Sequence, residues 1–379
     1  MKHRKIKWAL LGGGPDSLIG IVHRIAASMG EDYQLVGGVF NANVDIGRQF
    51  ARDLELDIRR AYADIDAFIA GEAALPADER VKVVTVATPN YLHYEMASKL
   101  IQAGFHVICE KPVTSTAAEA GNLAALLKSR QQVFAVTHTY TGYPMVRQMR
   151  GMIAAGLIGP IQKVDAQYYQ GWINEVIHDP AKRSTVWRLD PRKGGQSCCV
   201  GDIGVHAFNL IEYTTGRQVE KVLADVDTLY ADNALDVDGS ILLRFGGGLK
   251  GVLCASQIAT AEENNLAIAV YGRTGGLKWA QENPNQLEFL REGEPLAVIK
   301  PGHAFNLPEA RAATKMPPGH PEGIFDAMGN IYRGIAKAIN GVPVDAGAYP
   351  GIDAGVRGMR FVEAVLHSSR NGNIWVPIG

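Results

Sequence analysis

The chain has 379 residues, of which 47% are hydrophobic and 20% are charged, and its formal net charge is −1. This length and balance predict a globular protein of two domains, with three as the alternative, rather than a disordered or fibrous chain. Lys, Arg, Asp and Glu are scattered without runs of one sign, which argues against a nucleic-acid-binding arm or a patch for anionic membranes.

Four cysteines occur and none forms a CxxC pair, which does not suggest a disulfide scaffold. The N-terminal stretch "MKHRKIKWALLGGG" has basic residues before apolar ones, but it is too short and too glycine-rich for a signal peptide. No apolar run reaches the length of a membrane span. We therefore expect a soluble, cytoplasmic protein that binds neither nucleic acid nor membrane.

The first third of the chain alternates between strand-like and helix-like patterns. Apolar, β-branched runs predict strands at Ile6–Leu11, Tyr33–Phe40, Val81–Pro89, Phe105–Pro112 and Val133–Tyr140. Apolar residues at helical spacing predict helices at Ile19–Met29, Val44–Leu54, Tyr91–Ala103 and Thr116–Arg130. This alternation indicates βαβ units and a parallel sheet, so residues 1–140 are expected to form a doubly wound α/β domain.

Three segments whose residue types suit ligand binding or catalysis directly follow strands of this sheet: Gly12–Ser17, Thr88–Asn90 and Glu110–Pro112. Ligands of open parallel sheets bind beyond the carboxyl ends of the strands. We therefore expect these segments to share one edge of the sheet and to form a binding site there.

The glycine-rich segment "GGGPDSLIG" resembles the dinucleotide fingerprint G-x-G-x-x-G. Gly12 and Gly14 occupy the first two glycine positions, Ser17 stands at the third, and Gly20 comes later. The segment is interpreted as a lengthened phosphate-binding turn at a helix N-terminus, and the alternative is a simple glycine-rich turn.

Cofactor choice depends on the end of the second strand, where an acidic residue would bind the adenosine ribose. Asn41 occupies this place, and it can bind a 2′-hydroxyl without repelling a 2′-phosphate. No basic residue directly follows it, which favours NAD, although Arg48 leaves NADP possible. The alternative role for Asn41 is a turn residue that caps the next helix.

After residue 140 the pattern changes, and residues 141–379 are expected to form a second α/β domain with a large open, mostly antiparallel sheet. Its C-terminal helices could pack back on the first domain. Predicted strands are Ile161–Tyr169, Val219–Tyr230, Gly239–Phe245, Leu249–Gln257, Leu266–Tyr271, Gly276–Ala280 and Gln286–Leu290. The strands from Val219 onward follow one another with turns between them, so they are expected to form a meander. Predicted helices are 142–159, a segment that follows the glycine-rich turn near residue 200, Pro321–Asn340 and Ile352–Ser368, and 309–323 is expected to be a loop.

Three residues of this chain suit the oxidation of an alcohol. Asp202 and His206 are four residues apart in "DIGVH", so helical spacing places both on one face. Lys111 ends a predicted parallel strand, and Pro112 after it suits a cis peptide. Removing a hydride from a secondary alcohol also requires removing the hydroxyl proton, for which a histidine is suited, and a lysine can stabilise the negative charge on the oxygen.

Structural explanations compete with each of these assignments. A helical Asp and His pair often forms a surface ion pair, and a lone "EKP" is often a solvated turn. His93, His138 and His178 could be buried histidines with structural partners. Cys198, Cys199, Asp202 and His206 have the chemistry of zinc ligands, but their spacing fits no standard zinc pattern, so no metal is expected.

Together, "GGG…IGIVH", "ATPNYLH", "CEKP" and "GDIGVH" resemble the Gfo/Idh/MocA family of glucose–fructose oxidoreductase, inositol dehydrogenase and their relatives. "HTYTGYPMVRQMR" and "WRLDPRKGG" look like a branch that acts on sugars or cyclitols. The resemblance covers nearly the whole chain. It implies a Rossmann domain, a second domain with an open sheet, and homodimers or homotetramers that assemble through that sheet.

The resemblance also implies roles for individual residues. Lys111 would assist at the substrate hydroxyl, Asp202 would orient the substrate and His206 would accept the proton. The cofactor would contact Gly12, Gly14, Ser17, Leu18, Ile19, Asn41, Thr88, Pro89, Asn90, His93, Glu110 and Lys111. The substrate would contact Lys111, Tyr168, Trp172, Arg188, Asp202 and His206, with Asn174 and His178 as further candidates.

The leading hypothesis is an NAD(P)-dependent dehydrogenase of a ring hydroxyl in a sugar or inositol. One alternative is a retained-NAD glycosidase or lyase that oxidises the sugar transiently, and another is a non-catalytic NAD-binding regulator. Arg183, Arg188, Arg192 and Lys193 leave open a substrate that carries a carboxylate or sulfonate.

Overall fold

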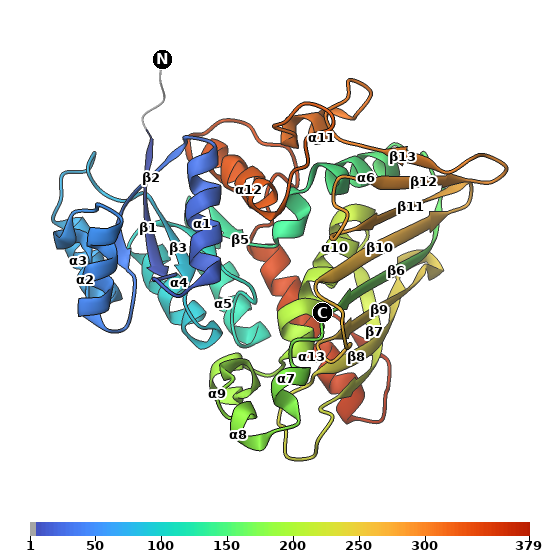
Figure 1. The fold of residues 1–379 in the computed structure, drawn as a ribbon, viewed down its shortest axis with the longest axis horizontal. Helices are drawn as coiled ribbons and strands as arrows, with labels where there is room; N and C mark the ends of the chain where they lie inside the picture. Colours follow the sequence, from blue (N-terminus) through green and yellow to red (C-terminus); the bar gives the residue numbers. More distant parts are fainter. Residues whose placement is uncertain (1–4) are drawn as a thin grey trace. The chain divides into compact units, whose positions relative to one another are not determined.

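A computed structural model of the protein describes residues 5–379, so the first four residues of the N-terminal stretch discussed above lie outside the described part. The chain divides into two compact units (Figure 1). The first runs to Thr137 and includes Met328–Val356, and the second comprises His138–Ala327 and Arg357–Gly379. The division passes through helices α12 (Ile324–Ile339) and α13 (Ile352–Arg370). The sequence predicted a boundary after residue 140, with C-terminal helices that could pack back on the first domain.

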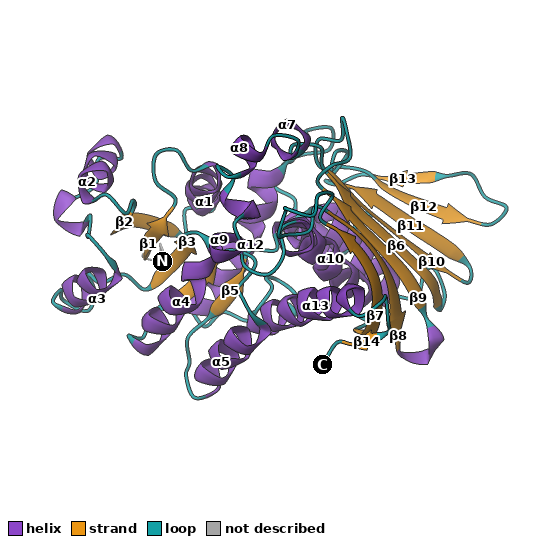
Figure 2. Cartoon of the chain, turned by 90° about the horizontal axis from the view of Figure 1, so that it is seen from below, coloured by secondary structure: helices purple, strands orange, loops and turns teal. Residues whose placement is uncertain are grey.

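The first unit contains a parallel sheet with the strand order β2-β1-β3-β4-β5. Its strands are β1 (Ile6–Gly12), β2 (Tyr33–Val39), β3 (Val83–Ala87), β4 (His106–Cys109) and β5 (Phe134–Val136). Its helices include α1 (Leu18–Met29), α2 (Val44–Asp53), α3 (Ile65–Ala73), α4 (His93–Gln102) and α5 (Ala117–Lys128). Helices α1 and α2 cover one face, and α3, α4 and α5 cover the other (Figure 2). The predicted doubly wound sheet is confirmed.

Local sequence explains where these helices start. Ser17 caps α1, Asn43 caps α2, and Thr116 with Glu119 forms a reciprocal capping box on α5. Each cap satisfies amide groups that the first helical turn leaves without partners. These helices follow the carboxyl ends of β1, β2 and β4 after short turns, so their N-terminal amides lie toward the edge expected to bind ligand.

The second unit contains a larger sheet with the order β13-β12-β11-β10-β6-β9-β8-β7-β14. Its strands are β6 (Ile161–Tyr169), β7 (Val219–Asp227), β8 (Asp238–Phe245), β9 (Lys250–Ser256), β10 (Asn265–Gly272), β11 (Gly275–Ala280), β12 (Leu287–Arg291), β13 (Ala297–Ile299) and β14 (Val376–Pro377). The strands pair antiparallel except β6 and β9, which run parallel. The predicted open, mostly antiparallel sheet is confirmed.

Helices cover one face of this sheet (Figure 2). They include α6 (Pro144–Ala154), α10 (Val205–Thr215) and the second-unit part of α13, and the short helices α7 (Asn174–Ile177), α8 (Pro180–Arg183) and α9 (Pro191–Gly194) precede α10. The buried core lies between these helices and the sheet, to which β6 contributes the alternate residues Val164, Ala166 and Tyr168. None of the helices within residues 5–379 is long and apolar enough to span a membrane.

Two expectations for this unit differ from the structure. The expected loop 309–323 overlaps the short helix α11 (Pro308–Ala313), whose Ala310 and Ala313 are fully buried. The later strands do not form a simple meander, because β6 is inserted between β9 and β10. Both differences arise from packing between segments distant in sequence.

Candidate active site

The glycine turn after β1 is built from close contacts that exclude side chains. Gly12 and Gly13 have positive φ angles of 78° and 64°. A Cβ on Gly12 would lie 2.4 Å from the Ala87 carbonyl oxygen, and one on Gly20 would lie 2.2 Å from the Gly13 carbonyl oxygen. Gly20 thus provides the close helix packing that the third glycine of the fingerprint provides. The Ser17 side chain accepts from the Gly20 amide at 3.1 Å, so Ser17 caps α1.

The turn also approaches the end of β2, because a Cβ on Gly14 would lie 2.4 Å from the Phe40 carbonyl oxygen. Asn41 follows, and its Oδ1 accepts from the Asn43 amide at 2.9 Å. Asn41 therefore stabilises the turn, whereas Asn43 caps α2. Leu18 is highly exposed at the start of α1, and Ile19 packs partly against the core.

Around the end of β3, one polar group has no protein partner. The Thr88 Oγ1 atom is buried without a hydrogen-bond partner, which in a native protein calls for a ligand or water. Pro89 and Asn90 follow at the start of a short 3-10 helix. A dinucleotide fits this edge, because the glycine turn offers close backbone approach and Thr88 offers an unsatisfied hydroxyl.

His93 connects two of the expected ligand-binding segments. Its Nε2 lies 2.9 Å from the Thr88 carbonyl oxygen, and its Nδ1 lies 2.8 Å from the Pro112 carbonyl oxygen. Burial, partly offset by these two contacts, lowers the pKa of His93. Both ring nitrogens thus face main-chain carbonyls, so the structural alternative explains His93, and its contact with cofactor stays a prediction.

Glu110 and Lys111 lie directly after β4, and the Lys111–Pro112 peptide bond is cis, as expected. The Glu110 carboxylate contacts His23 Nε2 at 3.1 Å, accepts from Thr137 Oγ1 at 2.5 Å, and accepts from the Lys111 amide at 3.2 Å. Burial acts to raise the pKa of Glu110, but these partners reverse the effect and lower it. Glu110 is therefore held as a carboxylate that anchors the backbone of Lys111.

In the second unit, Asp202 and His206 lie at the start of one long helical segment. Asp202 belongs to a π-helical turn, Val200–Gly204, and His206 belongs to α10 directly after it. π-Turns within helices occur frequently at functional sites. The Asp202 Oδ2 atom accepts from Gln257 Nε2 at 2.9 Å and lies 3.4 Å from Arg188 Nε. The Asp202 carboxylate is thus held by partners in the protein.

Aromatic and imidazole rings surround His206. Its ring packs edge-on against Tyr140 and His138, with centroid distances of 4.9 and 5.4 Å, and the two histidine Nδ1 atoms are 3.4 Å apart. Tyr168 hydrogen-bonds Tyr140 and donates to Asn264 Oδ1 at 2.6 Å. Burial raises the pKa of Tyr168 well above its usual value, so this phenol stays neutral and cannot act as the base.

The remaining candidates divide into those near Asp202 and those with other partners. Trp172 packs against a cluster that contains Cys198, and Arg188 contacts Asp202. Asn174 donates to the Ile258 carbonyl at 3.0 Å, and His178 contacts the Tyr230 hydroxyl at 2.8 Å.

Two of the basic residues considered for an anionic substrate have carboxylate partners within the protein. Arg183 pairs with Asp232, and Arg192 pairs with Asp190, so these two guanidinium groups already have carboxylate partners.

Across residues 5–379, no group of three or more His, Cys, Asp or Glu side chains is placed to hold a metal ion. Cys198 instead contacts Gln257 Oε1 at 3.2 Å.

Three partners of the candidate residues have no signal in the sequence pattern: His23 beside Glu110, Gln257 beside Asp202, and Asp236 behind the π-helical turn. His23 stands in the quoted "IGIVH", but nothing local indicates that it reaches Glu110. Lys111 belongs to the first unit, and Asp202 and His206 belong to the second.

Comparisons with known proteins match both parts of the chain. A family model described as "Oxidoreductase family, NAD-binding Rossmann fold" matches residues 6–138, and one described as "GFO/IDH/MocA C-terminal domain" matches residues 146–278. The uncharacterized oxidoreductase YfiI of Bacillus subtilis is 31% identical over 98% of this chain and 97% of its own length. Levoglucosan dehydrogenase of Pseudarthrobacter phenanthrenivorans is 27% identical over 66% of this chain and 74% of that protein.

Solved structures extend the match. An inositol dehydrogenase homologue from Azotobacter vinelandii, complexed with NAD+, has a TM-score of 0.92 and 33% identity over 99% of this chain and 98% of that one. Its complex with NADH and myo-inositol has a TM-score of 0.90 and 32% identity, with the same coverage of both chains. The first unit is an NAD-binding Rossmann domain, and the chain belongs to the Gfo/Idh/MocA family of oxidoreductases.

Proposed function

We propose that this protein is an NAD-dependent dehydrogenase that oxidises a ring hydroxyl of an inositol or a related sugar. The observation that carries the proposal is the π-helical turn that fixes Asp202 and His206 among polar and aromatic side chains. The relatives named above for inositol and levoglucosan support this substrate class.

The proposed roles follow from the chemistry of each side chain. His206 accepts the proton of the substrate hydroxyl, because imidazole is basic enough near neutral pH. Lys111 donates to the same oxygen and stabilises its negative charge, and the buried Glu110 holds the Lys111 backbone. Asp202 orients the polyol by accepting from a neighbouring hydroxyl. The nicotinamide, when bound, supplies the hydride acceptor.

The glycine turn and Thr88 would hold the dinucleotide, with Asn41 and Asn90 as further contacts. NAD is favoured over NADP because no basic residue directly follows Asn41 to bind a 2′-phosphate. The Asn41 Oδ1 atom accepts from the Asn43 amide. The side-chain NH2 group of Asn41 would then donate to a ribose hydroxyl.

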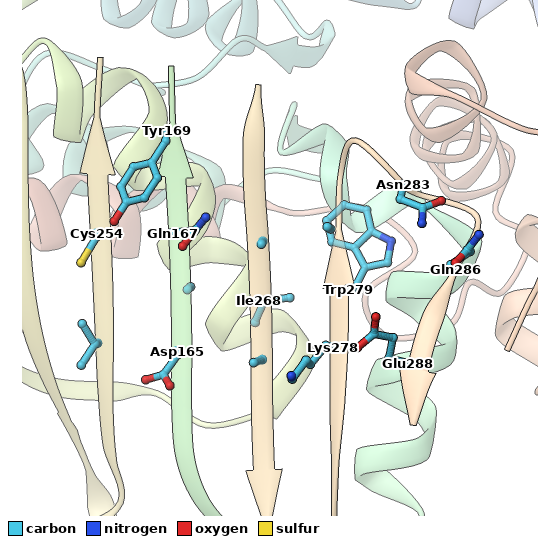
Figure 3. Close-up of a pocket in the computed structure, with 15 residues that line it drawn as sticks. Asp165, Gln167, Tyr169, Cys254, Ile268, Lys278, Trp279, Asn283, Gln286 and Glu288 are labelled. Carbon is cyan, nitrogen blue, oxygen red and sulfur yellow. The ribbon is translucent and has the colours of Figure 1, made fainter. Parts of the chain in front are cut away.

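We also infer that a second copy of the chain covers the open face of the large sheet. This face carries a hollow of about 450 Å³ lined by outward residues such as Asp165, Gln167 and Tyr169 (Figure 3). Lys278 and Glu288, cross-strand neighbours on β11 and β12, bring both charges to it. A patch with both charges can be self-complementary, as a two-fold interface requires. A homodimer or homotetramer follows.

A cytoplasmic location is also proposed, because four cysteines in a chain of this length, none in a CxxC pair, do not suggest the disulfide scaffold of a secreted protein. Cell fractionation tests it.

The catalytic proposal is tested by following NADH absorbance at 340 nm with NAD+ or NADP+ and a panel of inositols, free sugars and glycosides. We expect NAD+-dependent turnover of inositols or free sugars, and a kcat roughly 10²–10⁴-fold lower in His206→Ala. Lys111→Ala should lower kcat as well. Glycoside cleavage without net NADH would instead establish the retained-cofactor mechanism, and NAD binding without any turnover would favour the regulator.

A further inference from the structure

Gln257 is a buried side chain whose two polar atoms are both engaged. It follows β9 and is fully buried. Its Nε2 donates to Asp202 Oδ2 at 2.9 Å, and its Oε1 accepts from Cys198 Sγ at 3.2 Å. A series of two hydrogen bonds therefore runs from the Cys198 thiol through the Gln257 amide to the Asp202 carboxylate.

The chain of contacts fixes the orientation of the amide. A flipped amide would place Oε1 against the Asp202 carboxylate and Nε2 against a thiol, which is a weak acceptor. The backbone of Gln257 is also held, because its amide donates to the Val237 carbonyl at 2.9 Å and its carbonyl accepts from the Ile173 amide at 3.3 Å. One N–H of the Gln257 side-chain amide is thus directed toward Asp202.

At the other end of this hydrogen-bond series, Cys198 is held by a buried carboxylate, that of Asp236. Asp236 accepts from the Cys198 amide at 3.0 Å, the Val200 amide at 2.8 Å and the Ser197 hydroxyl at 3.0 Å. These residues form the entry to the π-helical turn that carries Asp202. Both the backbone and the carboxylate of Asp202 are thereby fixed from the same buried cluster.

We propose that Gln257 is a positioning residue for the oxidation reaction, which holds the Asp202 carboxylate in one orientation through an amide that Cys198 locks. The proposal rests on the proposed function, in which Asp202 orients the substrate. A carboxylate held by a neutral, directed donor can present its other oxygen to a substrate hydroxyl while keeping its negative charge.

Other charged or titratable groups also act on Asp202. Arg188 lies 3.4 Å from its Oδ2 atom, and the negative charge of Asp202 acts on Tyr140, Tyr168 and Cys199. His206 follows four residues later on the same helical segment. Since these groups are unchanged when Gln257 is replaced, a change in pH profile reports on the Gln257 contact itself.

The test compares Gln257→Met and Gln257→Glu with Gln148→Met. Gln148 is a matched control, because it is buried in the same unit and its Oε1 accepts from the Leu307 amide at 2.8 Å, away from Asp202. Gln257→Met should lower kcat/KM roughly 10- to 100-fold, as expected for a lost hydrogen bond to a charged group, with unchanged NAD affinity. Gln257→Glu should move the acidic limb of the pH–rate profile upward, because adjacent carboxylates disfavour ionisation of each other.

Cys198→Ser retains a donor to the amide and should keep near-native activity, whereas Cys198→Ala should lose part of it. The proposal is overturned if Gln257→Met behaves like Gln148→Met, with a lower Tm but native kcat/KM and pH profile. If the wild-type enzyme turns over no substrate, the proposed function has failed instead. The carboxyl ¹³C titration of Asp202, assigned with Asp202→Asn, then decides: an unchanged titration in Gln257→Glu overturns the contact.

Discussion

At the scale of single residues, Gly20 shows how backbone contact prevails over helix propensity. Gly20 and Gly121 both lie inside helices of the first unit, where alanine normally stabilises by about 1 kcal/mol. A Cβ on Gly121 would meet nothing within 4 Å, but one on Gly20 would meet the Gly13 carbonyl oxygen at 2.2 Å.

We therefore expect Gly20→Ala to distort the glycine turn and weaken NAD binding at least about tenfold, a change of roughly 1.4 kcal/mol. Gly121→Ala should leave NAD binding unchanged and raise Tm. Titration of NAD by calorimetry or fluorescence measures both. Equal affinities in the two variants would show that the turn does not shape the cofactor site.

His106 makes the stability of the first unit depend on pH. Its Nδ1 accepts from the Val133 amide at 2.8 Å, which requires an unprotonated nitrogen. Burial, with a smaller effect from Lys82, lowers the pKa of His106 below its ordinary value of 6.5. Below pH 6.5 the unfolded chain takes up a proton more readily than the folded one, so acidification destabilises the fold.

We expect Tm to fall as the pH drops from about 7.5 to 5, and His106→Asn to reduce that slope. The Asn oxygen can accept from the Val133 amide and does not titrate. His93 has a lowered pKa as well, so part of the slope remains. The account of His106 fails if the wild-type and variant Tm profiles run parallel over this range.

At the scale of elements, the local sequence pattern predicted where most strands and helices lie, but not which other elements they pair or pack with. The alternation of apolar residues in β6 predicted its bounds, yet its place between β9 and β10 depends on pairing with strands distant in sequence. α11 was missed because a helix of six residues is stabilised by burial of Ala310 and Ala313 rather than by its own periodicity.

In the candidate site, too, local sequence indicated the residues but not the side chains that contact them. Spacing alone indicated Asp202 and His206, and position at strand ends indicated Thr88 and Lys111. The side chain that fixes Asp202 comes from Gln257, 55 residues away in sequence. Such a contact depends on the assembled sheet, so no local motif could have predicted it.

At the scale of the whole molecule, the open sheet face predicts an oligomer that one substitution can break. Ala269 on β10 lines the hollow and is half-buried, so Ala269→Arg would place a bulky charge in the proposed interface. Asn122→Arg on the exposed side of α5 is the matched control. Light scattering should give a dimer or tetramer for the wild type and the control, but monomers for Ala269→Arg. A monomeric wild type would refute the interface.

The central claim is that a hydride moves from a ring carbon of a polyol to NAD. The most direct measurement is mass spectrometry of the nucleotide after incubation with NAD+ and inositols or sugars deuterated at their ring carbons. The account predicts NADH that carries one deuterium, formed by the wild type and lost in His206→Ala. Unlabelled nucleotide with every substrate, from protein shown to bind NAD, would contradict it.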